Sequence, residues 1–348
     1  MDQPDALWRH LARVAARYPS PHNTQPMRLH VDSPERATLL FDRAAVLDAH
    51  PLGVLFGHVT VGVYLECLSV AAHAVGHGLD VELEGGPDAT PVAAGEGLQP
   101  VARLRLVPLG SRVPDLDPAL LHRRRTSRLP YDGRDVDAHV LRLVAAECAG
   151  AGHRLATSAV PDVVAGVVAL DTEALVADLT TPAVRAELAA WVRTSERAAR
   201  ATRDGFGPRA LGTPGLLLRL VLAHPGLLRR GPVAALARRV RRATSAGTPR
   251  VAWVRGRLDG PADAVAAGRL LLRVWLVLTE HGVELQPYGS VVTSPWSLTR
   301  FHEVVGEPAA DGLATWLVVR LGHSAEPHRS PRRPLEDTVV SSALEAVR

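Results

Sequence analysis

Apolar residues recur along the chain with two different periods, and these periods predict the elements of the fold. In residues 5–17 they have the spacing of one face of an amphipathic helix, which Pro19 and Pro21 then end. Residues 54–76 and 262–281 are instead apolar on nearly every face, which is typical of buried helices. Shorter alternating or apolar runs predict strands, at 27–31, 38–41, 79–84, 101–107, 250–257, 283–286 and 314–321.

Further helices are predicted at about 136–150, 160–178 and 182–203. Pro- and Arg-rich sequence between residues 108 and 137 predicts a boundary between two parts of the chain. We therefore expect an N-terminal half-domain of residues 1–112 and a C-terminal half-domain of residues 113–348.

Residues 204–248 are dense in Gly, Pro and Arg, with one short leucine-rich helix near 214–222. We expect this segment to be a mostly irregular excursion that acts as a lid and not as part of the core. The tail 324–348 is also rich in Pro and Arg, and we expect it to end in a short helix.

The two buried helices end in the same way. The first leads to His77-Gly78 and the strand Leu79-Asp80-Val81-Glu82-Leu83, and the second leads to His281-Gly282 and Val283-Glu284-Leu285. Chance similarity is an alternative in a chain rich in Val and Leu, but an internal duplication is favoured. One chain would then imitate a two-subunit protein, with the central helices packed together.

Composition and charge narrow the class of protein. Hydrophobic residues make up 47% of the chain and charged residues 22%, which indicates a globular protein and excludes a disordered one. The chain has no Lys, so all 40 basic residues are Arg, and the net charge of +4 is weak support for a nucleic-acid partner. Cys67 and Cys148 are too few for a disulfide scaffold or a thiolate metal site, and no metal is expected.

The N-terminal residues are acidic and contain no apolar leader. The longest apolar runs are interrupted by Glu66 and Arg219, short of the roughly 18 residues of a membrane-spanning helix. We therefore expect a cytoplasmic protein without a membrane span.

The segment 19–28 is the first with candidate chemistry. Asn23 is the only asparagine in the chain, and Gln25 is one of four glutamines. Neutral amides carry both donors and acceptors, so they suit the edge of a heterocyclic ligand. A Pro-rich turn with an Asx cap explains the same residues, and composition alone does not decide between the two.

Two clusters of arginine suggest an anionic ligand. One lies within residues 122–131 and includes Thr126, and the other lies within residues 328–334 and includes Ser330. Guanidinium and hydroxyl groups together suit a phosphate, although either cluster alone is commonly a solvated basic face. In residues 286–290, Gly289 would let a ligand approach backbone N–H groups closely, and an ordinary turn is the alternative.

In this order, the four segments resemble the nitroreductase-like FMN flavoprotein superfamily, and more closely its long single-chain branch. The resemblance rests on the Pro-Ser-x-x-Asn-x-Gln-Pro loop, Arg-Arg-Thr-x-Arg, the Gly-bearing turn, the terminal Ser-Pro-Arg-Arg-Pro-Leu-Glu and the lid sequence 204–213. It implies an α+β, nitroreductase-like fold of two half-domains that imitate a homodimer. Each half-domain would have a small, mainly antiparallel sheet and a long buried central helix, with FMN at the junction.

The resemblance also implies roles for individual residues. The phosphate and ribityl chain of FMN would be held by Arg124, Arg125, Thr126 and Arg128, and the phosphate site would be closed by Arg332 and Arg333. The isoalloxazine would be lined by Pro19, Ser20, Asn23 and Gln25. Its N5 and O4 atoms would face backbone N–H groups of the turn Pro287, Tyr288 and Gly289.

Three positions of the expected substrate pocket depart from the family's pattern. Met27 stands where the family commonly has Trp, and Phe56 and His58 replace small polar residues. His22 lies in the flavin loop and is a candidate to donate a proton or contact substrate.

The expected function is two-electron transfer between FMN reduced by NAD(P)H and a small organic substrate. That substrate could be a nitro compound, a quinone, an enone or a biosynthetic intermediate. The alternative is a flavin-sequestering protein of the same fold, with FMN closed under residues 204–248 and little turnover. A basic module that binds nucleic acid or a membrane through residues 123–128 and 229–242 explains the apolar, sheet-bearing chain poorly. We expect no nucleic-acid partner, and both a monomer and a homodimer stay open.

Overall fold

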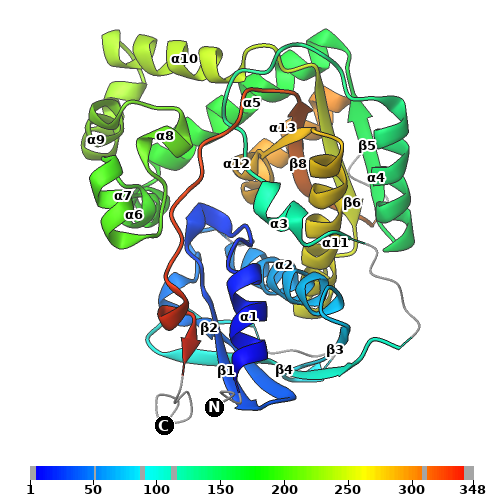
Figure 1. Ribbon diagram of the computed structural model, residues 1–348. Coiled ribbons are helices and arrows are strands. Elements are labelled where there is room, and N and C mark those ends of the chain that lie inside the picture. Colours follow the sequence, from blue (N-terminus) through cyan, green and yellow to red (C-terminus); the bar gives the residue numbers. More distant parts are fainter. Residues whose placement is uncertain (1–4, 51, 87–90, 111–115, 308–311, 341–348) are drawn as a thin grey trace.

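Two sheets, each beside a long buried helix, organise the chain (Figure 1). The computed structural model describes residues 5–50, 52–86, 91–110, 116–307 and 312–340. The first sheet has the order β3 (His77–Leu83), β4 (Leu98–Pro108), β2 (Arg36–Asp42), β1 (Met27–Ser33) and β9 (Val339–Val340). The second has the order β5 (Arg154–Ser158), β6 (Arg250–Gly256), β8 (Ala314–Gly322) and β7 (Glu284–Pro287). All pairs are antiparallel except β1 with β9. The predicted α+β class is confirmed.

The same succession of elements occurs in both halves. Helix α1 (Ala6–Ala15) precedes β1, as α4 (Ala138–Gly150) precedes β5. Helix α2 (Gly53–His73) lies between β2 and β3, as α11 (Pro261–Glu280) lies between β6 and β7. The sheet order β3-β4-β2-β1 thus corresponds to β7-β8-β6-β5. Each half contains the expected antiparallel sheet and central helix.

The central helices α2 and α11 pack on each other through two glycines. A Cβ on Gly62 would lie 1.9 Å from the carbonyl oxygen of Val265, and a Cβ on Gly268 would lie 1.9 Å from that of Val59. The contact is reciprocal, as at the interface of a two-fold dimer. Only glycine permits backbones to approach this closely.

One hydrophobic core includes residues of both sheets, of both central helices and of β9. Glu66 of α2, which interrupts an otherwise apolar helix, forms ion pairs of 3.2 Å with both Arg269 and Arg273 of α11. Among the described helices, α2 alone has the length and apolar character of a membrane span, but 78% of its most apolar window is buried in the protein. It is a core helix of this fold.

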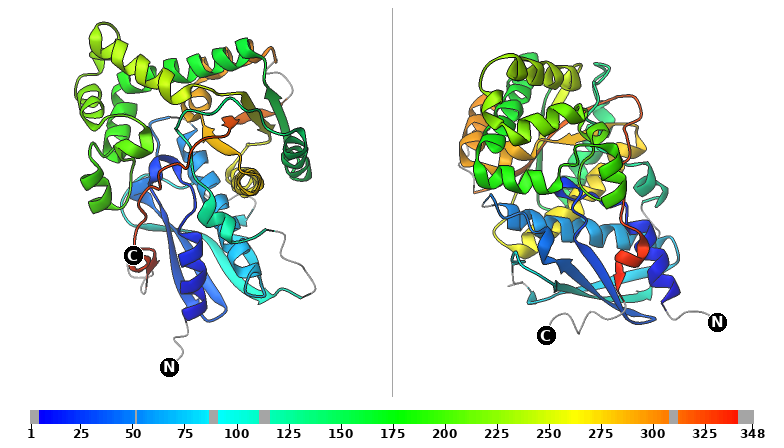
Figure 2. Two further views of the ribbon diagram at one scale, coloured as in Figure 1. Left: turned by 45° about the horizontal axis from the view of Figure 1, so that its top comes forward. Right: turned by 90° about the vertical axis from the view of Figure 1, so that its left-hand side faces the viewer.

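The C-terminal segment crosses from the second half to the first, where β9 joins the edge of the first sheet (Figures 1 and 2). It includes the short helix η5 (Leu335–Asp337). The predicted helical end of the tail lies partly in residues 341–348, outside the described part of the chain. The division of the chain at residues 112 and 113 stays a prediction.

A group of helices beside the second sheet contains the largest differences from the sequence-based expectation. The expected helix 182–203 is two helices, α6 (Pro182–Trp191) and α7 (Glu196–Thr202), because Ser195 caps the second by accepting from the Ala198 N–H. The expected irregular segment is mainly helical, with α8 (Pro208–Leu211), α9 (Gly215–Ala223), η4 (Pro225–Leu228) and α10 (Pro232–Ser245). Pro208, Pro225 and Pro232 occupy first helical positions, where proline begins a helix and does not break one, and Pro214 directly precedes α9.

Residues 204–248, for which we keep the name lid, pack a small apolar cluster of their own against α5 (Pro161–Thr180). Short helices that the pattern did not predict are α3 (Ala119–Arg123), α12 (Gly289–Thr293), η1 (Pro21–Asn23) and η2 (Arg43–Ala45). The longer α13 (Pro295–Val305) was also missed.

Candidate functional site

A cavity of about 460 Å³ lies where the two halves, the lid and the C-terminal segment meet. Its walls come from the loop after α1, the beginning of α2, the loop after α3, the turn between β7 and α12, and strand β8. Cavities of roughly 300–1,000 Å³ are the usual size of small-molecule sites.

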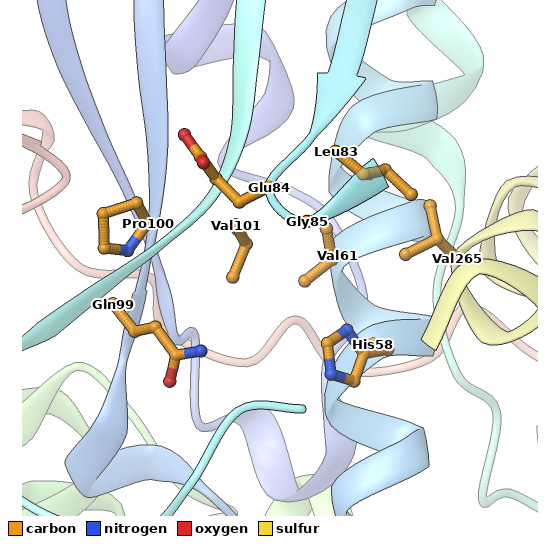
Figure 3. A pocket seen from close by; sticks show the side chains of 9 residues that line it. All are labelled: His58, Val61, Leu83, Glu84, Gly85, Gln99, Pro100, Val101 and Val265. Carbon is orange, nitrogen blue, oxygen red and sulfur yellow. The ribbon is translucent and has the colours of Figure 1, made fainter. Parts of the chain in front are cut away.

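Most residues predicted from the sequence line this cavity. They are Pro19, Ser20, His22, Asn23, Phe56, Arg124, Arg125, Thr126, Arg128, Pro287, Tyr288, Gly289 and Arg332. Four others lie elsewhere. Gln25 and Arg333 are bound to each other and to residues 203 and 204 outside the cavity lining, and Met27 is packed in the core. His58 lines a second, smaller cavity, where its Nε2 accepts from the Val92 N–H at 3.1 Å (Figure 3).

One end of the main cavity holds buried positive charge. Arg124 is 7% exposed; its Nη2 donates to the Arg17 carbonyl at 3.0 Å, and its guanidinium lies 4.5 Å from the ring centre of Trp275. Its Nε and Nη1, and Nε of Arg332, are buried and have no hydrogen-bond partner in the described residues. Burial lowers the pKa of Arg124 to about 10, and burial with the nearby charge of Arg124 lowers that of Arg332 to about 9. Buried charges without partners are costly, so this end favours an anion.

Glu284 of β7 is a carboxyl group close enough to Arg124 and Arg125 to feel their charge, although it is not among the residues that line the cavity. Burial raises its pKa to about 7, against the opposing effect of the charges of Arg125 and Arg124. Arg125 also forms an ion pair with the exposed Glu326 and donates to the Pro327 carbonyl at 2.8 Å. The net charge beside these arginines therefore changes near neutral pH.

Arg128 lies in a different part of the cavity, beside the lid. It donates to the Ala210 carbonyl at 3.2 Å, and its guanidinium lies 4.6 Å from the ring centre of Phe206. Burial lowers its pKa to about 10. Nearby, Arg241 of α10 forms an ion pair with Asp171 of α5. The predicted arginine cluster of residues 122–131 thus contributes Arg128 to the contact with the lid and Arg124 to the positively charged end of the cavity.

The loop 19–25 has a strained backbone at the cavity. His22, Asn23 and Gln25 have φ angles of 50°, 56° and 51°, in the left-handed region. Non-glycine residues in such conformations cost about 1–3 kcal/mol each and are concentrated at functional sites. The strain supports the sequence-based choice of this loop.

The two amides of this loop bind protein groups. Asn23 Nδ2 donates to the carbonyls of Gly205 at 3.0 Å and Pro331 at 3.2 Å, and its Oδ1 accepts from Arg332. This differs from the expectation that the amides read the edge of a ligand.

Gln25 is engaged in the same way. Its Nε2 donates to the Arg203 carbonyl at 2.9 Å, and its Oε1 accepts from the Arg333 N–H at 2.9 Å. Together the amides fasten the loop to the base of the lid and to the C-terminal segment. Sequence spacing does not reveal that segments so distant in the chain converge here.

His22 lies against the lid, with its ring centre 5.9 Å from that of Phe206. Its Nδ1 is buried without a hydrogen-bond partner in the described residues. Burial, then the charges of Arg128 and His50, lower its pKa to about 4. His22 is therefore neutral at neutral pH and has a ring nitrogen available for a ligand.

The turn after β7 offers fewer free N–H groups than expected. The Tyr288 N–H donates to the Val318 carbonyl at 2.8 Å, within the sheet. Gly289 begins α12, so its N–H has no carbonyl in that helix to bind. A Cβ at Gly289 would meet no protein atom within 4 Å, which leaves open space there.

Sequence analysis missed a polar cluster at the other end of the cavity. Asp178 of α5 accepts from Ser290 Oγ at 2.5 Å and pairs with His50 Nε2 at 3.1 Å. Burial raises the pKa of Asp178. The sequence does not single it out, because Asp178 is one of four acidic residues in the mainly apolar helix α5. Arg17 and Trp275 were also missed, and nothing in their sequence positions distinguishes them.

No protein-family model and no curated protein sequence matches the chain. Solved structures that match it include FMN-binding nitroreductases. The FMN- and NADPH-dependent nitroreductase NfnB from Sphigopyxis sp. strain HMH is 17% identical, with a TM-score of 0.40, and the match covers 64% of this chain and 97% of that one. A nitroreductase with bound FMN from Desulfitobacterium hafniense DCB-2 is 16% identical, with a TM-score of 0.38 and coverage of 64% and 97%. The NfnB protein from Mycobacterium smegmatis, in complex with NADPH, is 15% identical, with a TM-score of 0.38 and coverage of 64% and 96%.

Proposed function

We propose that the main cavity binds FMN and that the chain is an FMN-dependent oxidoreductase. The observation that carries this proposal is the pair of buried guanidiniums, Arg124 and Arg332, with nitrogen atoms that lack partners inside a cavity built by both halves. A phosphate monoester would supply the missing acceptors and the compensating charge. The reciprocal packing of Gly62 and Gly268 supports the further proposal that the chain is a duplicated pseudo-dimer.

The cavity residues fit the parts of this cofactor. Arg17, Arg124, Arg125 and Arg332 would hold the phosphate, and Thr126 has a hydroxyl beside it for the phosphate or the ribityl chain. Pro19, Ser20 and Pro287, with the open space at Gly289, would border the ring system. Bound FMN supplies two-electron chemistry, and the protein supplies position, electrostatics and exclusion of water.

Neutral His22 and the guanidinium of Arg128 face the same part of the cavity, beside Phe206 of the lid. There, Arg128 would stabilise negative charge on a bound molecule, and His22 would offer a hydrogen-bonding nitrogen. We propose NAD(P)H as the reductant and a nitro compound, quinone or enone as the substrate class.

A second function, flavin sequestration, is favoured by the lid. Phe206, Ala210, Leu218 and Val221 of the lid line the cavity, and the Asp204–Arg333 ion pair of 2.9 Å fastens the base of the lid. Anaerobic addition of NADPH or NADH separates the two functions. Rapid loss of flavin absorbance is expected for the oxidoreductase, and an inert flavin would support sequestration.

The first experiment is the visible absorption spectrum of the purified protein, followed by titration of the flavin-free protein with FMN. We expect saturable binding. Arg124→Ala should weaken FMN binding by about tenfold to 150-fold, the loss of a charged hydrogen bond of about 1.5–3 kcal/mol.

Arg123→Ala is the matched control, because the neighbouring Arg123 is exposed and lies outside the cavity lining. It should change the dissociation constant by less than about twofold. Equal effects of the two substitutions, or a protein that takes up no FMN, would contradict the proposal.

A further inference from the structure

The second cavity has a volume of about 320 Å³ (Figure 3). It is lined by residues of α2 and α11, of the end of β3 and the turn after it, and of β4. These are the elements that correspond, in the other half, to α11, α2, β7 and β8 of the main cavity.

The correspondence holds residue by residue in the strands and the turn after β3. In the sheets, Leu83 pairs with Ala102 as Pro287 pairs with Val319. This register equates Leu83, Glu84, Gly85, Gln99, Pro100 and Val101 with Pro287, Tyr288, Gly289, Trp316, Leu317 and Val318, and each residue of both sets lines its cavity.

The central helices add a further match. The reciprocal glycine contact equates Val265 with Val59, which line the second and the main cavity respectively. Two cavities related in this way occupy symmetry-equivalent positions, as the two sites of a two-fold dimer do.

We infer that the second cavity is a duplicate of the main one that does not bind FMN, and that the chain binds a single FMN, in the main cavity alone. The inference rests on the proposed function and on the proposed duplication. The chain would then contain two equivalent cavities, of which only one binds the cofactor.

The second cavity lacks the loop that builds a wall of the main one. Residues 16–26 connect α1 to β1 and supply Arg17, Pro19, Ser20 and Asn23 to the main cavity. The corresponding connection from α4 to β5 is only residues 151–153. The Nδ1 atom of His153, in this short connection, already accepts a hydrogen bond of 3.1 Å from Trp316 Nε1.

The second cavity also lacks the positive charge that would attract a phosphate. None of its described lining residues is an arginine, and Glu84 stands where the main cavity has Tyr288. Its other polar side chains are Gln99 and His58, which Figure 3 shows on opposite sides of the space. A carboxylate without nearby lining cations repels an anionic cofactor.

Titration of the flavin-free protein with FMN, followed by absorbance and calorimetry, tests the inference through stoichiometry. We expect one FMN per chain. Two per chain would overturn the inference and leave the proposed function standing, whereas none would overturn both.

A matched pair of substitutions then locates the site. Val318→Trp fills the main cavity and should weaken FMN binding by at least about tenfold. Val101→Trp fills the equivalent position of the second cavity and should change the dissociation constant by less than about twofold. The reverse pattern would place FMN in the second cavity and overturn both the inference and the proposed FMN site.

Two less disruptive variants keep the test valid if the tryptophan substitutions in the strands unfold the protein. Circular dichroism checks that each variant is folded. Gln99→Trp places at the edge of the second cavity the residue type found at Trp316, and it should keep one FMN per chain. Arg124→Ala should weaken the single binding event. An FMN that binds unchanged after Arg124→Ala and is lost after Gln99→Trp would place the cofactor in the second cavity and overturn the inference.

Discussion

At the residue scale, the site is dominated by charge that the protein does not neutralise itself. The Arg124 guanidinium is stacked on Trp275 and held by one carbonyl, so its position is fixed while two of its nitrogens stay available. Such preorganisation lowers the ordering cost of ligand binding. Cys67 is buried near Arg124 and Arg332, and burial raises the pKa of its thiol, so it adds no negative charge there.

Glu284 makes this site sensitive to pH. Because its pKa is raised to about 7, the carboxyl is protonated in mild acid and becomes an anion near the phosphate site above neutral pH. Glu284→Gln should therefore bind FMN roughly fivefold more tightly than the wild type at pH 8.5, a charge interaction of about 1 kcal/mol. At pH 5.5 the two proteins should bind equally.

The measurement is the ratio of the two dissociation constants across this pH range, in which the titration of the phosphate itself cancels. Glu326→Gln removes a carboxylate that is 77% exposed beside Arg125, and it should show no step near pH 7. A ratio that stays constant from pH 5.5 to 8.5 would show that Glu284 does not face the bound anion.

At the scale of elements, hydrophobic periodicity was enough for most strands and for the two central helices, but it missed β5 and β9. It failed in the lid, where Pro208 and Pro232 look like helix breakers but occupy first helical positions. It also could not show that Asn23 fastens two distant segments, because that contact depends on tertiary structure. The arginine cluster could be identified from the sequence as a candidate site. The sequence could not show that some of its buried guanidinium nitrogens have no hydrogen-bond partner.

The packing of α2 on α11 gives a prediction at this scale. Gly62→Ala and Gly268→Ala should each destabilise the protein by about 1–3 kcal/mol, because the added Cβ collides with a backbone carbonyl. Gly150→Ala, in a helix with no atom within 4 Å of the added Cβ, should be neutral or slightly stabilising.

Urea unfolding with a common slope for all variants measures these differences. Because the two contacts are reciprocal, the free energy of unfolding should fall by a similar amount in Gly62→Ala and in Gly268→Ala. A loss at one glycine and none at the other would contradict the equivalence of the two helices.

At the scale of the whole molecule, stability is unevenly distributed. The large core joins residues of both halves, so it is complete only when both halves are folded. The lid packs a separate small cluster around Leu217, Val221 and Leu228. Regions with few buried apolar contacts open with a lower free energy than the core.

Hydrogen exchange should therefore report fast exchange in α9 and α10 and slow exchange in α2 and α11. Added FMN should slow exchange in α9 and in residues 328–332, which line the main cavity, and leave β3 and β4 unchanged. Protection of β3 and β4 instead would place the ligand in the second cavity. Lid opening that stays measurable with FMN bound would give a small substrate access to the flavin. A lid that becomes as slow to exchange as the central helices would identify the protein as a flavin store, because no second molecule could then reach the cavity.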